Sequence, residues 1–241
     1  MLKVEKVTGG YHNLPVLKEV SFEVGAGELV GLIGLNGAGK STTIKEILGL
    51  LRPHSGQIRV GGVSLEDKPQ AYRQQLGFVP ETPSLYEELN LREHLETVAM
   101  AYDLEPALVL ERAQPLLEAF RLADKLDWFP TDFSKGMQQK VMLVCAFVVD
   151  PGLLLIDEPF LGLDPLAIEE LKQLLAQAKA AGKAILMSTH VLDSAEKLCD
   201  RFVILHEGRV RAQGTLAELR QAFGQPTADL NSLYLTLTRE A

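Results

Sequence analysis

The chain opens with apolar and polar residues in alternation, which is the pattern of half-buried β-strands. Both "LKVEKVTGGY" (2–11) and "VLKEVSFEV" (16–24) follow this pattern. After the turn "GAG" (25–27), "ELVGLI" (28–33) is almost continuously apolar, which predicts a strand buried on both faces. We therefore expect an antiparallel β portion at the start of the chain, followed by a buried strand.

The spacing of apolar residues changes to that of a helix in two places. The first is "KSTTIKEILGLL" (40–51), which is expected to end at Arg52-Pro53, before a strand and turn in "SGQIRVGGVSL" (55–65). The second is the region from about 90 to 150, where "LREHLETVAMAYDL", "PALVLERAQPLLEAFRL" and "GMQQKVMLVCAFVV" predict three helices. This uninterrupted helical region predicts a separate lobe.

Buried strands and helices alternate again after the helical region. "GLLLID" (152–157) and "KAILMSTH" (183–190) predict two strands, and the helix between them is expected to begin at the N-cap Asp164 and stop at Gly182. A helix in "VLDSAEKLC", a hairpin that turns at Gly208 and a helix in "TLAELRQAF" follow. This alternation predicts an α/β fold with a parallel-sheet core. The expected organisation is one domain over 1–220, with a core from 1–89 and 151–220, a helical lobe at about 90–150, and a tail at 221–241.

Composition narrows the possible functions. The 241 residues carry a net charge of −8 and no run of five Lys or Arg, so we expect no nucleic-acid partner. The longest uncharged apolar stretch, "VMLVCAFVV" (141–149), is too short to span a membrane. Cys145 and Cys199 lack CxxC neighbours, which favours buried free thiols in a reducing compartment over a metal site. We expect a cytosolic chain without a leader, which works at a membrane only through a partner.

The segment "GLNGAGKST" (34–42) joins the buried strand to the first helix and matches G-x-x-x-x-G-K-[ST]. Its glycines allow backbone N–H groups to surround phosphate oxygens, and the N-terminus of the helix adds a positive dipole. Lys40 supplies a charge for the terminal phosphates, Ser41 a hydroxyl ligand for Mg²⁺, and Thr42 a further phosphate contact. The motif in this strand–helix context predicts a nucleoside triphosphate site; a flexible turn is the less specific alternative.

Two adjacent acids end the buried strand in "LLLIDEPFLGLDP" (153–165). The carboxyl ends of parallel strands form the ligand-binding edge of an α/β sheet. We therefore expect Asp157 to hold Mg²⁺ through a water, and Glu158 to orient or deprotonate an attacking water. The alternative is a solvated strand end, in which the paired acids have no chemical use.

At this point the chain resembles the ATP-binding subunit of ABC transporters over nearly its whole length. "GGYHNLPVLKEVSF" (9–22) is similar to the family's opening, with Tyr11 in the place of the aromatic that stacks on adenine. "FSKGMQQK" (133–140) stands where the signature LSGGQ lies, "LGLD" (161–164) resembles the D-loop, and "STH" (188–190) ends with the switch histidine. The resemblance implies a P-loop NTPase (RecA-like) core with an N-terminal antiparallel β portion and an inserted α-helical lobe.

One departure from the family lies in "LGFVPETPSLYEELN" (76–90), which resembles the Q-loop region. Glu81 stands where the family usually has Gln. This adds a third carboxylate to Asp157 and Glu158, which strengthens Mg²⁺ binding but repels the triphosphate. The alternative is that Glu81 points to solvent or to a partner and is not a ligand.

A second departure lies in the signature segment. Lys135 and Met137 replace the usual Gly and Gln, whereas Ser134 and Gly136 are kept. The resemblance implies that Ser134 and Gly136 contact the γ-phosphate of a nucleotide held by the opposite chain. Together with Glu81, this segment looks most like the Ecs-type branch, of the ABC-2 exporter type.

The resemblance implies a head-to-tail dimer that closes around two ATP molecules with Mg²⁺. One chain supplies nucleotide, metal and catalytic groups to each site, and the other supplies its signature and D-loop. The nucleotide-binding residues are Tyr11, Asn36, Gly37, Ala38, Gly39, Lys40, Ser41 and Thr42; the metal ligands are Ser41, Glu81 and Asp157; the catalytic residues are Glu158, His190 and Lys40; the signature and D-loop residues are Ser134, Gly136 and Asp164.

Two classes of function fit this sequence. The first is the motor subunit of a transporter, which is expected to be cytoplasmic and peripheral on the inner face of the cell membrane. It is expected to work with an identical or different second ATP-binding subunit and a separate permease. The permease is then expected to dock in a groove near residues 81–100, where Tyr86, Glu87 and Glu88 are candidate contacts.

The second class of function is a soluble ABC ATPase in repair, translation or cofactor assembly. The single domain without a coiled-coil insert favours the transporter, and "GLDP" with a short tail favours an exporter; the cargo is not encoded in this chain.

Overall fold

The computed structural model describes residues 1–12 and 14–239. Within them, the strands form a three-stranded sheet in the order β2-β1-β4 and a six-stranded sheet in the order β5-β6-β7-β3-β8-β9. The strands are β1 Leu2–Tyr11, β2 Leu14–Val24, β3 Leu29–Ile33, β4 Ser55–Val60, β5 Leu76–Val79, β6 Leu153–Asp157, β7 Ala184–Thr189, β8 Arg201–His206 and β9 Arg209–Gly214. The smaller sheet is antiparallel, and the larger is parallel from β5 to β8. The predicted fold class is therefore confirmed.

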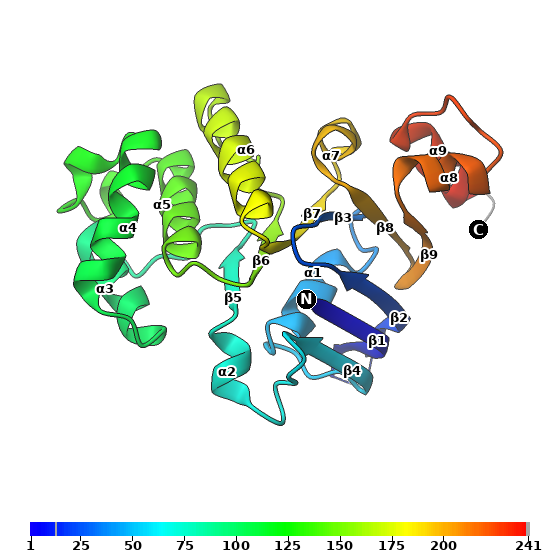
Figure 1. Ribbon diagram of the computed structural model, residues 1–241, viewed down its shortest axis with the longest axis horizontal. Coiled ribbons are helices and arrows are strands. Elements are labelled where there is room, and N and C mark those ends of the chain that lie inside the picture. The colour runs from blue at the N-terminus through cyan, green and yellow to red at the C-terminus, as the bar shows by residue number, and fades with distance from the viewer. Residues whose placement is uncertain (13, 240–241) are drawn as a thin grey trace.

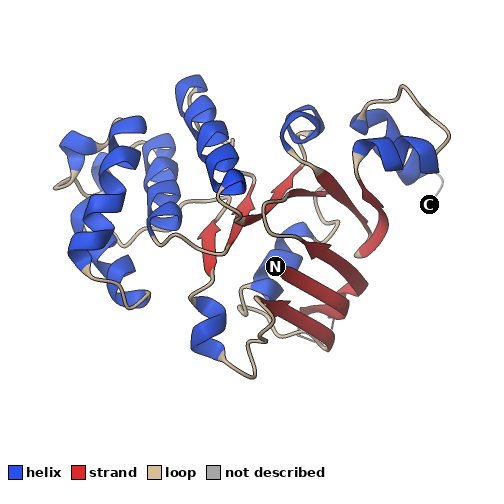
Figure 2. Cartoon of the chain, viewed as in Figure 1, coloured by secondary structure: helices blue, strands red, loops and turns tan. Residues whose placement is uncertain are grey.

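The helices are α1 Lys40–Ile47, α2 Pro69–Arg73, α3 Leu91–Ala101, α4 Pro106–Ala119, α5 Lys135–Val148, α6 Pro165–Ala180, α7 Leu192–Leu198, α8 Leu216–Ala222 and α9 Leu230–Arg239, with short 3-10 turns at Ala123–Lys125 and Pro130–Asp132. Helices α3, α4 and α5 stand together on the left of Figure 1, beyond the edge strand β5. Figure 2 shows this helical lobe beside the strands of the two sheets. Among the described helices, none has the length and apolar character needed to cross a membrane.

The central strands are buried on both faces, and successive residues along a strand pack in two different hydrophobic cores. On β6, Leu153 and Leu155 pack in the core that contains α1 and the antiparallel sheet. Leu154 and Ile156 pack in the core that joins the parallel sheet to α6 and the helical lobe. This double burial explains why the β6 segment is a continuous apolar run and not an alternating one.

Local signals set several helix ends. Asn90 and Glu93 form a capping box at the start of α3, with each side chain accepting a hydrogen bond from the other residue's backbone N–H. The Asp164 carboxylate accepts from the Ala167 N–H at 3.0 Å, which confirms Asp164 as the N-cap of α6. Gly182 follows α6 with a φ of 82°, so the left-handed conformation ends the helix as predicted.

The first helix is shorter than predicted. It ends at Ile47 and not near residue 51, because Gly49 adopts a φ of 73°. The backbone N–H groups of Leu50 and Leu51 then both donate to the Lys45 carbonyl, at 2.9 and 3.2 Å. The turn leaves the Leu50 side chain 68% exposed beside the helical lobe instead of inside a helix.

Glu46, on the α1 face turned toward the antiparallel sheet, is an acid in an apolar setting. It is 3% exposed, and a Cβ at Gly9 of β1 would overlap its carboxylate. Within the described part of the chain, neither carboxylate oxygen has a hydrogen-bond partner. Burial without a partner disfavours the charged form and raises the pKa of Glu46 from 4.5 to about 7.

The Glu46 carboxyl should make the free energy of unfolding depend on pH. Because its folded-state pKa lies above the ordinary value of 4.5, the free energy of unfolding should decrease as pH rises from about 4.5 to about 7. Replacing Glu46 with Gln removes this titration, so Glu46→Gln should gain about 2–3 kcal/mol relative to the wild type between pH 5 and pH 8. Urea unfolding at both pH values measures the difference. The exposed Glu66→Gln serves as the control, and an identical pH dependence in Glu46→Gln and wild type would contradict the expectation.

Candidate functional site

A cavity of about 540 Å³ opens where β3, β6 and β7 end. The parallel register places Ile33 opposite Thr189 and Asp157 opposite Ser188, so the segments that follow these strands leave the sheet at one edge. The cavity is lined by Tyr11, Val16, Leu35, Asn36, Gly37, Gly39, Lys40, Ser41, Thr42, Glu81, Asp157, Glu158 and His190. Three-dimensional packing therefore brings together the phosphate loop, the acid pair and the strand-end histidine that sequence analysis singled out.

Two glycines are required by the path of the loop between β3 and α1. A Cβ at Gly34 would lie 2.7 Å from the Leu205 carbonyl oxygen and 2.8 Å from the Ala38 Cβ. Gly39 has a φ of 110°, and a Cβ there would lie 2.7 Å from a Leu17 methyl group. Glycine therefore permits both the close approach to β8 and the left-handed turn that begins α1. This compact loop directs its remaining residues and the N-terminus of α1 at the cavity.

Lys40 is buried at the base of the cavity. Its ammonium group donates a hydrogen bond to the Gly34 carbonyl at 2.8 Å and lies 3.8 Å from a Glu158 carboxylate oxygen. The charge is thus held beside the loop by one backbone oxygen and one acid. A buried cation next to free N–H groups at a helix start is suited to phosphate oxygens.

Glu158 lies directly after β6 and is buried. Its backbone adopts a φ of 47°, which is uncommon for a residue with a side chain, and its N–H donates to the Ser188 carbonyl at 3.0 Å. One carboxylate oxygen accepts from the Thr189 hydroxyl at 3.0 Å, and the other lies 2.7 Å from His190 Nδ1. The strained backbone and these partners fix the carboxylate in the cavity, where it can orient or deprotonate a water.

The residues expected to hold Mg²⁺ border the same cavity. Asp157 ends β6, is buried, and accepts a hydrogen bond from the Ser188 hydroxyl. The Ser41 hydroxyl and the exposed Glu81 also border the space. The described residues contain no cluster of three or more Asp, Glu, His or Cys able to hold a metal by themselves. Oxygen donors of this kind suit a magnesium ion that takes its other ligands from phosphate and water.

The structure places Tyr11 at the cavity rim, at the end of β1. Its hydroxyl accepts a hydrogen bond from the Lys45 ammonium at 3.1 Å, and that ammonium lies 5.5 Å from the ring centroid. Lys45 on α1 therefore braces the ring beside the phosphate loop. Ala38, in contrast, does not border the cavity: it is buried, and its carbonyl accepts from the Gly208 N–H at 3.0 Å.

The signature and D-loop residues lie outside this cavity, on the helical lobe and the loop before α6. The Ser134 hydroxyl caps α5 by accepting from the Met137 N–H at 3.3 Å. A Cβ at Gly136 would lie 2.5 Å from the Gly162 carbonyl, so the start of α5 approaches the D-loop closely. Lys140 on α5 lies 2.6 Å from Asp164, and this ammonium, followed by the Ala167 N–H, lowers the pKa of the Asp164 carboxyl.

Three residues that support the site were not predicted. Ser188 and Thr189 hold Asp157 and Glu158 by hydrogen bonds, and both lie within the "STH" segment that was noted only for its histidine. Gln139 on α5 is buried and donates to the Pro80 carbonyl at 3.2 Å, which ties the helical lobe to the residue before Glu81. The roles of Ser188 and Thr189 could have been predicted, because both residues lie at the end of a buried strand. No feature of the sequence indicated the role of Gln139.

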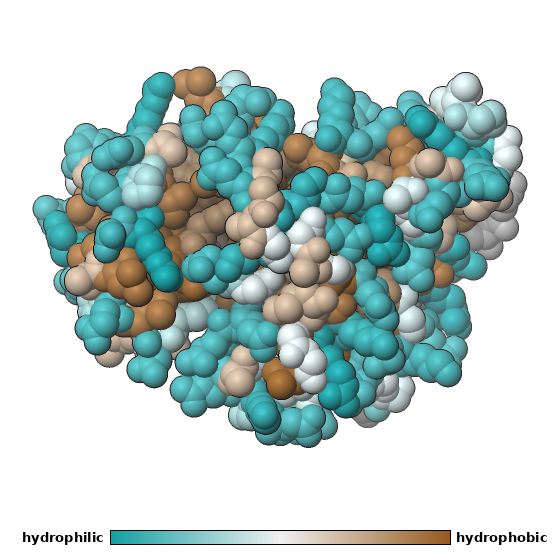
Figure 3. All heavy atoms as spheres, in the orientation of Figure 1, coloured by the Kyte–Doolittle hydropathy of each residue, from teal (hydrophilic) through white to brown (hydrophobic). Residues whose placement is uncertain are grey.

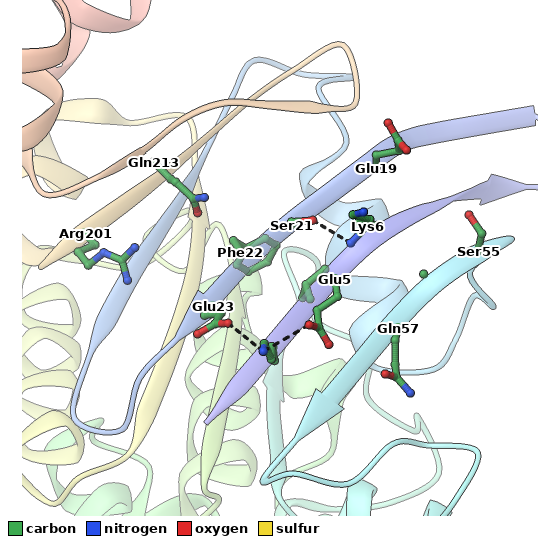
Figure 4. A pocket seen from close by; sticks show the side chains of 13 residues that line it. Glu5, Lys6, Glu19, Ser21, Phe22, Glu23, Ser55, Gln57, Arg201 and Gln213 are labelled. Carbon is green, nitrogen blue, oxygen red and sulfur yellow. Dashed lines mark hydrogen bonds and ion pairs between the residues drawn. The ribbon is translucent and has the colours of Figure 1, made fainter.

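A second hollow of about 830 Å³ lies over the antiparallel sheet, with side chains from β1, β2 and β4 around it (Figure 4). At its centre Lys3 is already paired with two acids, because its ammonium lies 3.3 Å from Glu5 and 3.4 Å from Glu23. These pairs are exposed and sit on a sheet face, away from the carboxyl ends of the parallel strands. The cavity around Lys40 is therefore the candidate nucleotide site.

Comparison with known proteins agrees with this geometry. Residues 17–161 match the family described as "ABC transporter". The chain is 56% identical over 240 residues to the ABC-type transporter ATP-binding protein EcsA of Bacillus subtilis (strain 168), covering 100% of this chain and 97% of that protein.

Solved structures show the same fold. The ATP-binding subunit of an ABC transporter superposes with a TM-score of 0.96 at 55% identity, over 99% of both chains. The ATP-binding cassette MJ0796, a dimer in a post-hydrolysis state bound to ADP and Pi, superposes with a TM-score of 0.80 at 26% identity, over 90% of this chain and 99% of that one. The expected family, P-loop fold and ATPase activity are confirmed, and the chain belongs to the ATP-binding, ATP-hydrolysing subunits of the ABC transporter family.

Proposed function

We propose that this chain is the motor subunit of an exporter-type ABC transporter. It works on the cytoplasmic face of the cell membrane, where two ATP-binding subunits close around two ATP molecules and drive a separate permease. The observation that carries the proposal is the buried Glu158 carboxylate between Lys40 and His190, at the edge of the sheet where the phosphate loop begins. The exporter direction rests on the resemblance of the signature and "GLDP" segments to exporter-type subunits.

Each residue at the cavity has a role in this proposal. Asn36, Gly37 and the residues from Gly39 to Thr42 bind the phosphates, and Lys40 neutralises the charge on the terminal ones. Glu158 is the base that orients and deprotonates the attacking water, while His190 contacts the γ-phosphate and holds the Glu158 carboxylate in place. Tyr11 stacks on adenine at the rim. Burial of the acid and the lysine keeps competing water away from both charges.

The location of the signature residues supports a composite site. Ser134 and Gly136 lie on the lobe side of the chain and do not border the cavity that holds Lys40. A second chain in head-to-tail orientation can present them to the γ-phosphate, with the loop around Asp164 alongside. The dimeric state of the related ATP-binding cassette supports this arrangement. ATP binding then closes the dimer, and hydrolysis opens it.

Glu158→Gln should trap the closed dimer. The amide keeps the size of the side chain but cannot accept a proton, so turnover should decrease by at least about 100-fold. ATP should then convert the variant from monomer to a stable dimer, as measured by light scattering during gel filtration. Glu111→Gln on the exposed face of α4 is the matched control. Wild-type turnover in Glu158→Gln, or a monomer in the presence of ATP, would refute this assignment.

We also propose that Ser41, Asp157 and Glu81 surround Mg²⁺ bound with ATP. All three border the cavity, and they supply one hydroxyl and two carboxylates, which are donors that Mg²⁺ prefers. When bound, this ion neutralises charge on the phosphates. Glu81 is exposed at the cavity edge, so it can approach the ion without a change in the buried core.

Changing Glu81 to Gln should weaken magnesium binding. Removal of one carboxylate should raise the half-saturating Mg²⁺ concentration for ATP hydrolysis by roughly threefold to tenfold. Asp157→Asn should raise it further, because Asp157 is buried beside the phosphate loop. Mn²⁺ binding in the presence of ADP, followed by electron paramagnetic resonance, gives a readout independent of turnover. If Asp157→Asn changes Mn²⁺ affinity and Glu81→Gln does not, Glu81 is not a ligand.

The permease is proposed to dock in a groove between the core and the helical lobe. An apolar hollow of about 590 Å³ lies there, bordered by Leu48, Leu50, Leu76, Phe78, Ala101 and Tyr102. Leu50 is 68% and Met100 79% exposed, and hydrophobic side chains gather over the lobe on the left of Figure 3. No residue of the expected 81–100 region lines this hollow, which meets that region only at its end, at Ala101. Tyr86, one of the expected contacts, is exposed but does not line the hollow, and its N–H donates to the buried His94 ring at 3.0 Å.

A charge in this groove should release the permease. In the complex, Leu50→Glu places a carboxylate against apolar surface, which is unfavourable. The amount of a polytopic membrane protein that co-purifies from detergent-solubilised membranes should therefore fall about tenfold or more. The equally exposed Leu14→Glu on β2 is the control and should retain the partner. If wild-type chain recovers only soluble partners, the transporter role is wrong; if both variants retain a membrane protein, the groove is wrong.

A further inference from the structure

One peptide group at the start of the phosphate loop is held from both sides. The Gly34 carbonyl accepts a hydrogen bond from the Lys40 ammonium at 2.8 Å. The N–H of the same peptide group, on Leu35, donates to the Tyr234 hydroxyl at 3.0 Å. In a trans peptide the C=O and the N–H point in opposite directions within the peptide plane, so Lys40 and Tyr234 bind opposite edges of this peptide group. A rotation of the peptide would break both hydrogen bonds.

Tyr234 reaches the loop from the C-terminal helix α9. The side chain is only 3% exposed, and it packs in a core with Ile33, the last residue of β3, and Ala195 of α7. In Figure 1, α9 and α8 lie together beside β8 and β9, at the opposite end from the helical lobe. The hydroxyl that meets Leu35 is therefore presented by a packed helix and not by a loose tail.

Polar contacts fix α9 relative to the segment that carries the switch histidine. The Glu196 carboxylate on α7, the helix that follows His190, accepts from the Leu230 N–H at 2.6 Å. Arg220 on α8 donates to the Ala228 carbonyl at 2.7 Å and lies 3.9 Å from Glu196. These contacts connect α7, α8 and the start of α9, so the position of the Tyr234 hydroxyl depends on the core around the nucleotide site.

We propose that Tyr234 is a positioning residue for ATP binding, which acts through the Gly34–Leu35 peptide on the phosphate loop and on Lys40. The inference rests on the ATP binding that family membership shows, and Tyr234 itself touches no phosphate. Without its hydroxyl, the Leu35 N–H loses its partner and the free loop populates other orientations of the peptide. Nucleotide then binds to a smaller fraction of molecules, and its apparent affinity falls by the same factor.

Tyr234→Phe removes only the hydroxyl and tests this directly. A neutral hydrogen bond changes an equilibrium by roughly threefold to tenfold, so affinity for a fluorescent ATP analogue should weaken by that factor. The KM for ATP should rise equally, with kcat within about twofold, because bound phosphates hold the loop once ATP is in place. The matched control is Tyr72→Phe, which removes a buried hydroxyl that donates to the Ile47 carbonyl at 2.6 Å, at the far end of α1. Wild-type affinity in Tyr234→Phe would overturn the proposal, and so would an equal loss in Tyr72→Phe.

Amide exchange provides a second test that does not depend on turnover, and its first arm needs only the wild type. In nucleotide-free wild type, the Leu35 amide should be protected, since it is hydrogen-bonded to a buried hydroxyl. In Tyr234→Phe, exchange should accelerate over residues 33–37 but not over β6. Rapid exchange of the Leu35 amide in wild type would overturn the proposal while leaving the ATPase assignment intact.

Discussion

Because β3, β6 and β7 pair in parallel, the residues that follow them leave the sheet at one edge. The register sets Ile33 beside Thr189 and Asp157 beside Ser188. The phosphate loop, the acid pair and His190 are distant in sequence, yet this pairing makes them neighbours. The strands are buried on both faces, so a slip of one residue would exchange the two faces and disrupt the packing of both cores. The geometry of the nucleotide site is therefore a consequence of the same packing that stabilises the sheet.

The buried Glu158 carboxylate connects stability with chemistry. A carboxylate that is removed from water must be paired or hydrogen-bonded, and here Thr189, His190 and Lys40 meet that need. The same contacts aim the group into the cavity. Glu46, only a few residues along α1 from Lys40, is the opposite case: it is equally buried but without a hydrogen-bond partner in the described chain, and its pKa rises to about 7. Partners, and not burial alone, distinguish the acid that we propose as the catalytic base from one that weakens folding near neutral pH.

Contacts between distant segments extend outward from the site in two directions. Toward the helical lobe, Gln139 on α5 reaches the Pro80 carbonyl beside Glu81, and the start of α5 lies against the loop that contains Gly162. Toward the C-terminus, α9 reaches the phosphate loop through Tyr234. Both connections end on backbone groups next to residues at the cavity. The lobe and α9 are therefore both joined by hydrogen bonds to the backbone beside the candidate nucleotide site.

The sequence by itself determined the α/β class, the lobe and the phosphate loop, because apolar periodicity and short motifs act over neighbouring residues. It missed α2 and β5, which are too short to show a period, and it left α9 in an unassigned tail. Only the tertiary structure decided that Tyr234 holds the Leu35 amide across 199 residues, and that Gly9 leaves room for Glu46. Such contacts depend on how distant segments pack, and no local pattern of residue types specifies that geometry.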